Sequence, residues 1–400
     1  MSRKKLRIAV IFGGRSGEHE VSIMSAASII AAIPKDKYEV IPVGITKEGR
    51  WLVGGDPMAA LTGGRLALPA LTAGGSGTAD ESRTEGEGRS AGESRGGSEI
   101  ASATVLPLPG ERRLVSVESG GALKNVAPFD VVFPVLHGTY GEDGTIQGLL
   151  ELADIPYIGA GVAGSAVGMD KALMKAIFRA AGLPVADFLV IKRHEVEETP
   201  QMVRQKVEEH LGYPCFVKPA NLGSSVGVSK VRQAAELQSA LLEAAAYDRK
   251  LVVEKAVSDA LEVEVSVLGN DEPKASIPGE IVPANEFYDY NAKYRDDSQL
   301  FIPARLSPAC TQKVRDMAIQ AFLACDCAGM ARVDFFVSKK DESVLVNEIN
   351  TIPGFTRISM YPKLWEASGL PYPELIERLI ELALERHQEK QRSKTSYDWS

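Results

Sequence analysis

The first apolar run of the chain predicts the opening of an α/β domain. Residues 8–12 are uninterruptedly apolar and end at two glycines, which is typical of a buried parallel strand that enters a turn. Apolar residues recur at helical spacing from Ser22 to Ile33, and a second apolar strand follows at residues 38–46. A strand, a helix and a strand in this order indicate an α/β sheet.

The apolar pattern then disappears. From Thr72 to Glu99 there is no Val, Leu, Ile, Met or aromatic residue, and Gly, Ser, Glu and Arg dominate. Such a segment cannot bury enough apolar area to offset the entropy lost on ordering. We expect a disordered insertion around residues 62–125, within an N-terminal α/β domain at 1–160. A regulatory segment that orders on a partner is the alternative.

Beyond residue 128 strands and helices alternate again. An apolar strand is predicted at 130–136, a helix around 148–152 and a short strand near 156–158. Asp170 is a suitable cap for a helix that stops at Gly182. A C-terminal helix is predicted at 373–388. We expect a central subdomain, a C-terminal subdomain and a tail, at residues 161–253, 254–390 and 391–400.

Polar residues interrupt an apolar strand near the C-terminus. In LVNEINTIPGF, residues 345–355, Glu348 and Asn350 alternate with Val346 and Ile349. Burying an unpaired charge costs several kcal/mol, so the carboxylate needs a partner.

The preceding strand supplies matching polar groups. In ARVDFFV, Arg332 and Asp334 share one strand face, and a turn at 338–343 would pair this strand with the next as a hairpin. Asp334, Glu348 and Asn350 would then converge as hard oxygen ligands, a set that suits Mg²⁺ bound together with nucleotide phosphates. A solvent-facing hairpin without a metal is the alternative.

Two lysines stand where a phosphate would explain them. Lys171 lies in the first turn of its helix, where the macrodipole disfavours cations. Lys218 interrupts an apolar strand in YPCFVKPANLGSSVGV, and Ser224 and Ser225 follow in a Gly-rich loop that could bind phosphate oxygens. A surface lysine and a ligand-free hairpin are the alternatives.

The strands after the Gly-rich loop carry further acidic positions. Glu254 and Lys255 end one strand, where backbone and side chains could pair with the edge of a purine. Glu262 and Glu264 alternate with valines on the next strand, and Glu262 could contact a ribose. A half-exposed strand without a ligand explains one of these acids equally well.

The composition limits the partners. The 400 residues carry a net charge of −8, which argues against nucleic acid and against an anionic membrane surface. No apolar stretch approaches ~20 residues, so we expect no membrane span and no signal peptide. Reduced core thiols in a cytoplasmic protein are the expected state of the four cysteines, Cys215, Cys310, Cys325 and Cys327.

Several long motifs in order indicate a family. They are GGRSGEHEVS, HGTYGEDGTIQG, KPANLGSSVGVSKV, YDYNAKY and RVDFFV followed by NEINTIPGFTRISMYPKLW. The chain resembles the D-alanine–D-alanine ligase family from about Ile8 to Leu384, except between roughly Leu61 and Pro128. The resemblance implies an ATP-grasp architecture of three domains, in which an N-terminal parallel-sheet domain precedes two α+β subdomains that clasp ATP.

The resemblance also implies a reaction. ATP phosphorylates the carboxylate of one D-alanine, and the amine of a second D-alanine attacks the acyl phosphate to give the dipeptide used in peptidoglycan precursors. Two Mg²⁺ ions, replaceable by Mn²⁺, and a homodimer are family expectations. The alternatives are a sister ligase that joins D-alanine to D-lactate or D-serine, a more distant ATP-grasp carboxylase or glutathione-type ligase, and a nucleotide-binding regulator without catalysis.

For the nucleotide and the metal, the resemblance implies three groups of residues. The residues implied to hold phosphates are Lys171, Lys218, Ser224 and Ser225. Those implied at adenine and ribose are Glu254, Lys255, Val257 and Glu262, while Leu261 replaces a basic residue that is common in relatives. Those implied to hold metal are Asp334, Glu348 and Asn350.

For the substrates, the resemblance implies a second set. Arg332 and the backbone N–H of Gly354 would form the oxyanion hole. The first D-alanine would meet Glu18 and His137, and the second Ser359, Lys293 and the apolar Met360. Glu18, Ser224 and Tyr294 would form a hydrogen-bonded trio, and residues 280–303 a lid.

Overall fold

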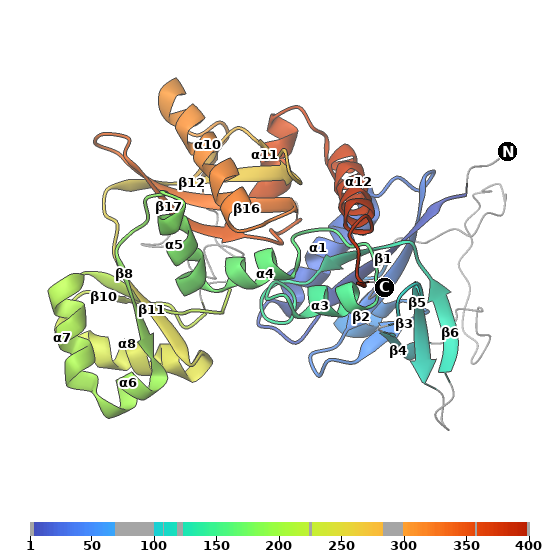
Figure 1. Cartoon of the computed structure of the whole chain (residues 1–400), viewed down its shortest axis with the longest axis horizontal. Helices are drawn as coiled ribbons and strands as arrows, with labels where there is room; N and C mark the ends of the chain where they lie inside the picture. The colour runs from blue at the N-terminus through green and yellow to red at the C-terminus, as the bar shows by residue number, and fades with distance from the viewer. Residues whose placement is uncertain are drawn as a thin grey trace, which may run out of the picture.

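The structure is a computed structural model that describes residues 4–68, 100–106, 108–117, 123–223, 226–282, 299–356 and 358–397. Within these residues the strands form three sheets (Figure 1). The strands are β1 (Leu6–Gly13), β2 (Tyr38–Ile45), β3 (Trp51–Val53), β4 (Ala101–Val105), β5 (Arg113–Val117), β6 (Leu123–Pro128), β7 (Val131–Val135), β8 (Phe188–Lys192), β9 (Cys215–Pro219), β10 (Ser229–Val231), β11 (Lys250–Lys255), β12 (Ala260–Gly269), β13 (Lys274–Ala275), β14 (Gly279–Val282), β15 (Gln299–Phe301), β16 (Gly329–Ser338) and β17 (Val344–Asn350). The helices are α1 (His19–Ala32), α2 (Pro57–Thr62), α3 (Thr145–Leu152), α4 (Val162–Met169), α5 (Lys171–Ala180), α6 (Arg193–Glu198), α7 (Pro200–His210), α8 (Ala234–Tyr247), α10 (Pro308–Ala324), α11 (Met360–Ala367) and α12 (Tyr372–Lys390).

The first sheet has the order β6-β5-β4-β3-β2-β1-β7, and β1 pairs in parallel with both β2 and β7. The predicted opening of an α/β domain is confirmed. Along β1, Ile8, Val10 and Phe12 pack in a cluster with α1 and α12, whereas Ala9 and Ile11 pack in the cluster that contains α3. Alternate side chains of β1 are therefore buried on both faces of the sheet, which explains its uninterrupted apolar run.

The disordered insertion expected around residues 62–125 is wrong for its C-terminal part. Strands β4 and β5 lie wholly inside that range, and β6 begins inside it. Ala103, Val105 and Leu114 are buried in the core, because the short segments that carry them alternate apolar with polar residues as half-buried strands do. The segment Thr72–Glu99, on which the expectation rested, lies outside the described residues.

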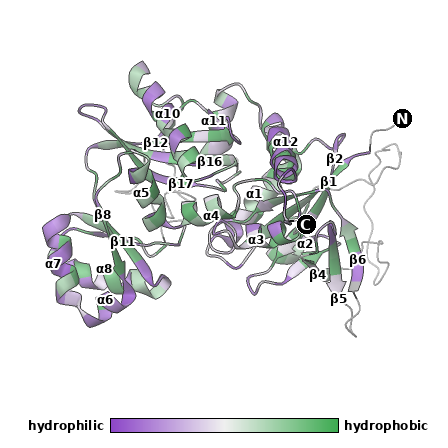
Figure 2. Ribbon diagram, in the orientation of Figure 1, coloured by the Kyte–Doolittle hydropathy of each residue, from purple (hydrophilic) through white to green (hydrophobic). Residues whose placement is uncertain are grey.

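The other two sheets pack helices against one face, and α11 also covers part of the opposite face of the six-stranded sheet, where Met360 and Leu364 are buried with Ile281. In the four-stranded sheet, β10-β9-β11-β8, Cys215, Val217 and Val253 pack against α6, α7 and α8. In the six-stranded sheet, β15-β14-β12-β16-β17 with β13 beside β12, Val265 and Val333 pack in the cluster with α5 and α10. Figure 2 shows mainly hydrophobic strands β8 and β11 and a hydrophilic α7 on the outside.

These two sheets enclose the pocket described below. Successive residues of a strand point to opposite faces, so the polar residues between the core positions point away from the covering helices. Phe216 and Lys218 of β9 and Glu262 and Asp334 of the six-stranded sheet line one pocket. In Figure 1, α5 lies between the six-stranded sheet above and the four-stranded sheet below.

The four cysteines are free thiols, and all of them are buried, as the sequence predicts. Burial raises the pKa of the Cys215 thiol to about 11 and that of Cys325 to about 12, so both thiols stay protonated at neutral pH. Among the described residues, no helix is long and apolar enough to cross a bilayer.

Candidate active site

Lys171 stands at the N-terminus of α5, as predicted. Asp170 caps this helix, and its Oδ1 accepts hydrogen bonds of 3.1 Å from the backbone N–H groups of Ala172 and Leu173. The Lys171 ammonium donates to the carbonyl of Leu222 at 2.8 Å, just before the Gly-rich loop. Residues 224 and 225, the predicted phosphate-binding serines, lie outside the described residues.

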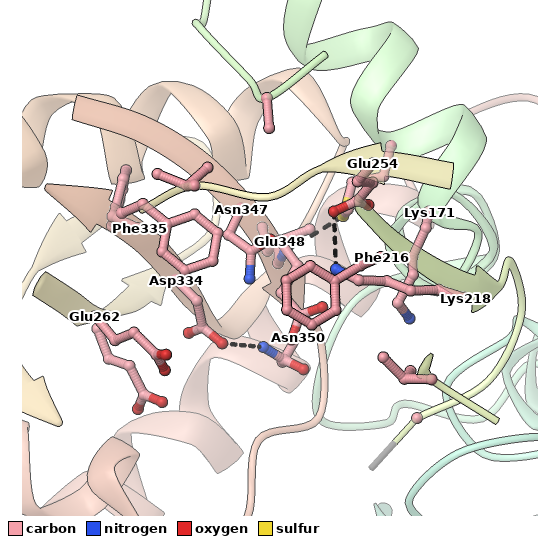
Figure 3. Close-up of a pocket in the computed structure, with 18 of the residues that line it drawn as sticks. Lys171, Phe216, Lys218, Glu254, Glu262, Asp334, Phe335, Asn347, Glu348 and Asn350 are labelled. Carbon is pink, nitrogen blue, oxygen red and sulfur yellow. Dashed lines mark hydrogen bonds and ion pairs between the residues drawn. The ribbon is translucent and has the colours of Figure 1, made fainter. Parts of the chain in front are cut away.

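Lys218 has the partner that its position in an apolar strand requires. Its Nζ lies 2.8 Å from Oε2 of Glu254, and Nζ of Lys175 lies 3.3 Å from Oε1 of the same carboxylate. Figure 3 shows Glu254 and Lys218 joined across the pocket wall. Burial alone would raise the pKa of Glu254, but the two ammonium groups outweigh it and lower that pKa, so the carboxylate stays charged.

Lys175 escaped the sequence analysis. Its side chain is 1% exposed although lysine is one of the least often buried residue types. The sequence places Lys175 four residues after Lys171 and therefore on the same helix face, but this spacing alone does not indicate burial. Burial lowers its pKa, while Glu254 acts in the opposite direction.

The predicted hairpin of β16 and β17 is confirmed. Asp334 pairs with Glu348 and Arg332 with Asn350, so the four polar residues lie together. The register shifts after Asp334, because Phe335 pairs with Val346 and leaves Asn347 as an extra residue in β17. This β-bulge lets Val346 and Ile349 both enter the core although they are three positions apart.

Asp334 is the centre of this polar group. Its two oxygens accept 2.7 Å hydrogen bonds from Nε and Nη2 of Arg332, and Oδ2 also accepts from Nδ2 of Asn350 at 3.0 Å (Figure 3). Glu264 lies 3.1 Å from Nε of Arg332. Burial would lower the pKa of Arg332, but these carboxylates raise it well above its ordinary value.

The donor set fits a hard divalent cation. Glu348, Asp334 and Asn350 offer carboxylate and amide oxygens on one wall of the pocket. Within the described ranges, no three His, Cys, Asp or Glu side chains are grouped to hold a metal. Two carboxylates and one amide would therefore need further oxygen ligands from a bound substrate, as is usual for Mg²⁺ with nucleotide phosphates.

The residues predicted at adenine and ribose line the same pocket. Lys255, Val257 and Glu262 are all among its walls, and Phe216 also lines it (Figure 3). Glu254 also lines the pocket, but its carboxylate contacts Lys175 and Lys218. Leu261, the departure from the family pattern, is half-buried and packs against the core beneath β12.

Glu18, in the N-terminal domain, lies close to the Gly-rich loop. A side chain at Gly223 would place its Cβ 2.4 Å from Oε2 of Glu18, and one at Gly138 would place it 2.7 Å away. A side chain at either glycine would therefore force the Glu18 carboxylate to move. Of the predicted trio, Glu18 is in place at the loop, and Ser224 and Tyr294 fall outside the described residues.

His137 is buried with both ring nitrogens bonded. Its Nδ1 lies 3.0 Å from the carbonyl oxygen of Ile352, so Nδ1 must carry the proton there. Nε2 then accepts from the hydroxyl of Ser25 at 3.1 Å, and the oxygen of that hydroxyl accepts from the N–H of Phe355 at 3.3 Å. Burial lowers the pKa of His137, in keeping with this neutral tautomer. The ring therefore connects the N-terminal domain to residues 352–355, and its contact with a substrate carboxylate stays a prediction.

Glu142 is a second residue that the sequence analysis missed. Its Oε2 accepts from the N–H of Gly138 at 2.7 Å, and its Oε1 accepts from the N–H of Ile352 at 3.2 Å. Burial, with a contribution from Glu18, raises the pKa of Glu142 to about 8. The residue stands in the HGTYGEDG motif, but only the fold brings it next to Glu18 and Ile352.

Gly354 and Ser359 are adjacent, as the oxyanion and second-substrate assignments require. A Cβ at Gly354 would lie 2.8 Å from Oγ of Ser359, so only glycine fits there without displacement. The Ser359 hydroxyl accepts from the N–H of Thr356 at 3.0 Å. Met360 is buried with Ile281, beside Gly279. Residue 293, the other predicted contact of the second substrate, is not among the described residues.

Comparisons with known proteins agree with this geometry. Residues 7–160 match the family model "D-ala D-ala ligase N-terminus", and residues 177–381 match "D-ala D-ala ligase C-terminus". The chain is 52% identical over 392 residues to a D-alanine–D-alanine ligase of Thermoanaerobacter sp. (strain X514), covering 97% of this chain and 99% of that one. It is 47% identical to a D-alanine–D-alanine ligase of Natranaerobius thermophilus, covering 99% and 100%.

Solved structures give the same result. The D-alanine-D-alanine ligase of Coxiella burnetii superposes with a TM-score of 0.76 at 37% identity, covering 98% of this chain and 97% of that one. The VanG D-Ala:D-Ser ligase of Enterococcus faecalis gives a TM-score of 0.77 at 31% identity, covering 95% and 100%. The expected ATP-grasp fold is confirmed. The chain therefore belongs to the D-alanine–D-alanine ligase family.

Proposed function

We propose that the chain joins two D-alanine molecules in an ATP-dependent reaction that passes through D-alanyl phosphate. One observation carries the proposal: the cationic group around Lys218 and the oxygen-rich group around Asp334 line a single pocket. Cations suit the nucleotide phosphates, and hard oxygen ligands suit the ion that accompanies them. The full-length match to curated D-alanine–D-alanine ligases supports this choice of substrate.

Each wall of the pocket has a part in the reaction. Lys171 and Lys218 hold negative phosphate oxygens, and Ser224 and Ser225 add donors from the Gly-rich loop. Lys255, Val257 and Glu262 form the adenosine side of the same pocket. These contacts place the γ-phosphate toward the hairpin of β16 and β17, where the carboxylate of the first D-alanine attacks it.

The hairpin then serves the second step. The guanidinium of Arg332, fixed by Asp334 and Glu264, and the N–H of Gly354 donate to the oxygen that becomes negative when the amine attacks the acyl phosphate. Glu18 binds the ammonium of the first D-alanine. Ser359 and Lys293 bind the carboxylate of the second, and the lid at residues 280–303 keeps water from the acyl phosphate.

Asp334, Glu348 and Asn350 are the residues that would hold divalent cations. We assign Mg²⁺, two ions per site with Mn²⁺ as a substitute, because the donors are hard oxygens without His or Cys. A bound Mg²⁺ neutralises the charge that develops on the transferring phosphoryl group. We further propose domains at residues 1–160, 161–253 and 254–390, a cytoplasmic homodimer, and no nucleic-acid or membrane partner.

A sister activity is the main competitor. The relative from Enterococcus faecalis is named a D-Ala:D-Ser ligase and has the same fold, so the fold does not fix the second substrate. Met360 favours a small apolar side chain at that position, because it lies buried among Ile281 and Leu364 next to the Ser359 hydroxyl. A D-alanine second substrate has such a side chain, whereas D-serine carries a hydroxyl that would need a polar partner.

The test is a competition with product identification. Purified protein is mixed with ATP, MgCl₂ and equimolar D-alanine, D-serine and D-lactate at pH 7, and the products are separated by mass spectrometry. We expect D-alanyl-D-alanine to dominate, with one phosphate released per dipeptide. Dominance of D-alanyl-D-serine or D-alanyl-D-lactate would assign a sister activity, and the absence of any ligated product would favour a regulator.

A further inference from the structure

Strand β17, which carries Glu348 and Asn350, lies at the edge of its sheet. Among the described strands the order ends at β17, so no described strand pairs with its outer backbone groups. Three contacts from outside the sheet cover that edge. The N–H of Val346 donates to the carbonyl of Pro184 at 2.8 Å, and the N–H of Ile349 donates to the sulfur of Met174 at 3.3 Å.

Lys175 supplies the third contact. Its ammonium donates to the carbonyl oxygen of Asn347 at 3.0 Å. Asn347 is the extra residue of the β-bulge, so Lys175 bonds a carbonyl of the bulge itself. Helix α5 therefore holds the bulge directly, through a side chain that is 1% exposed.

The bulge decides which way the metal-binding residues point. In a regular strand, a shift by one residue moves every later side chain to the opposite face. If Asn347 were instead paired as in a regular strand, Glu348 and Ile349 would exchange faces, and Ile349 would leave the core. The Lys175 contact thus stabilises the conformation in which Glu348 and Asn350 line the pocket with Asp334 (Figure 3).

The Lys175 ammonium also contacts Glu254, which lies on β11 of the four-stranded sheet. Glu254 is shared by Lys175 and Lys218, so two cations face one carboxylate, and the Glu348 carboxylate also acts on both ammonium groups. Lys175, which is part of α5, therefore contacts both the end of β11 and the bulge of β17. These elements carry the phosphate side and the metal side of the pocket.

We propose that Lys175 is a positioning residue that locks the β17 bulge and so aligns Glu348 and Asn350 for a divalent cation beside the nucleotide phosphates. The inference rests on the proposed function for the identity of the pocket. It predicts that Lys175 affects the binding of metal more than the binding of nucleotide.

The experiment compares Lys175→Met with Arg179→Met, which removes a cation from the same helix at a half-exposed ion pair with Asp187. Mn²⁺ is titrated by electron paramagnetic resonance into protein saturated with ADP, and ADP affinity is measured by calorimetry in EDTA. We expect Lys175→Met to weaken Mn²⁺ binding by ~10–100-fold, the usual effect of losing a contact that orients a metal ligand. Metal-free ADP affinity should change less than Mn²⁺ affinity, and Arg179→Met should change neither.

A loss of folding is separated from a loss of alignment by a second, conservative variant. Lys175→Met leaves Glu254 paired with Lys218 alone, one carboxylate with one ammonium, whereas Lys175→Arg keeps a cation that can donate to both Glu254 and the Asn347 carbonyl. Thermal unfolding reports the folding of each variant, and Mn²⁺ affinity should decrease from the wild type to Lys175→Arg to Lys175→Met. Wild-type Mn²⁺ affinity in Lys175→Met, or an equal loss of metal-free ADP affinity in either variant, would overturn the inference. The titration contains no D-alanine, so a wild-type protein that binds Mn²⁺ and ADP but makes no dipeptide would refute only the proposed function.

Discussion

Arg332 shows how a buried cation is kept both charged and oriented. Asp334 binds two of its nitrogens at 2.7 Å, and Glu264 lies 3.1 Å from Nε, so the direction of the guanidinium is fixed before a substrate arrives. A donor that is already oriented needs no reorganisation when negative charge develops. We therefore propose that Arg332 acts in the chemical step and not in nucleotide binding.

Replacing Arg332 with alanine should lower kcat by ~10²–10³-fold, the usual effect of losing one oxyanion-hole donor. ADP affinity in EDTA should stay close to that of the wild type, because the guanidinium contacts carboxylates of the hairpin. Steady-state kinetics and calorimetry measure the two quantities, with Arg179→Ala as the control for loss of an arginine. A retained kcat with weakened ADP binding would move Arg332 to the nucleotide side.

Glu142 makes a prediction about pH. Its pKa is raised from an ordinary 4.5 to about 8 by burial and by Glu18, so the folded protein holds the proton more strongly than the unfolded chain. The contribution of this proton to the free energy of unfolding is complete below pH 4.5 and is lost as the pH rises toward 8. Glu142→Gln does not titrate, so its free energy of unfolding should fall less than that of the wild type across this window. Urea unfolding of the ligand-free proteins at several pH values measures the difference, and parallel profiles would contradict it.

At the residue scale, the sequence predicted those polar side chains that interrupt an apolar pattern. Lys218 and Glu348 stand out because their neighbours are apolar, and each faces the pocket. Glu142 and Lys175 do not stand out, because the loop and helix around them contain other polar residues. Their importance comes from partners far along the chain, Ile352 and Asn347, which only the folded structure identifies.

At the element scale, the hairpin of β16 and β17 was predictable in its pairing and not in its bulge. On β16, the alternation of apolar and polar residues predicts which side chains face the pocket. In β17 the core residues Val346 and Ile349 are three apart, a spacing that does not fit a regular strand and that the bulge at Asn347 explains. Strands β4 and β5 were missed because they are short and lie next to a long segment without apolar residues.

Glu348→Gln should abolish turnover and leave the fold intact. The amide keeps the size of the side chain but loses the charge and is a poorer ligand for Mg²⁺. Dipeptide formation at ordinary Mg²⁺ and thermal unfolding are the two measurements. Asp341→Asn, in the turn of the same hairpin, serves as the control for loss of an exposed acid. Near-normal turnover of Glu348→Gln would remove Glu348 from the metal site.

At the scale of the whole molecule, three sheets meet at the site through a few long-range contacts. Glu18 approaches Gly223, and His137 bonds Ile352, so the N-terminal domain touches both the Gly-rich loop and the segment after β17. The order of the elements follows from the sequence pattern. Their relative placement does not, because contacts between residues more than two hundred positions apart leave no periodic signal in the chain.

The central claim is that ATP activates D-alanine as an acyl phosphate in this pocket, and oxygen transfer tests it most directly. In that reaction a carboxylate oxygen of the first D-alanine attacks the γ-phosphorus, and the carbon–oxygen bond breaks when the second amine attacks, so the oxygen leaves with phosphate. With D-alanine labelled by ¹⁸O in its carboxylate, unlabelled ATP and MgCl₂, mass spectrometry should find one labelled oxygen in each phosphate formed together with dipeptide. Phosphate released without label would contradict the account, because it would show that ATP is hydrolysed by water and never forms the acyl phosphate.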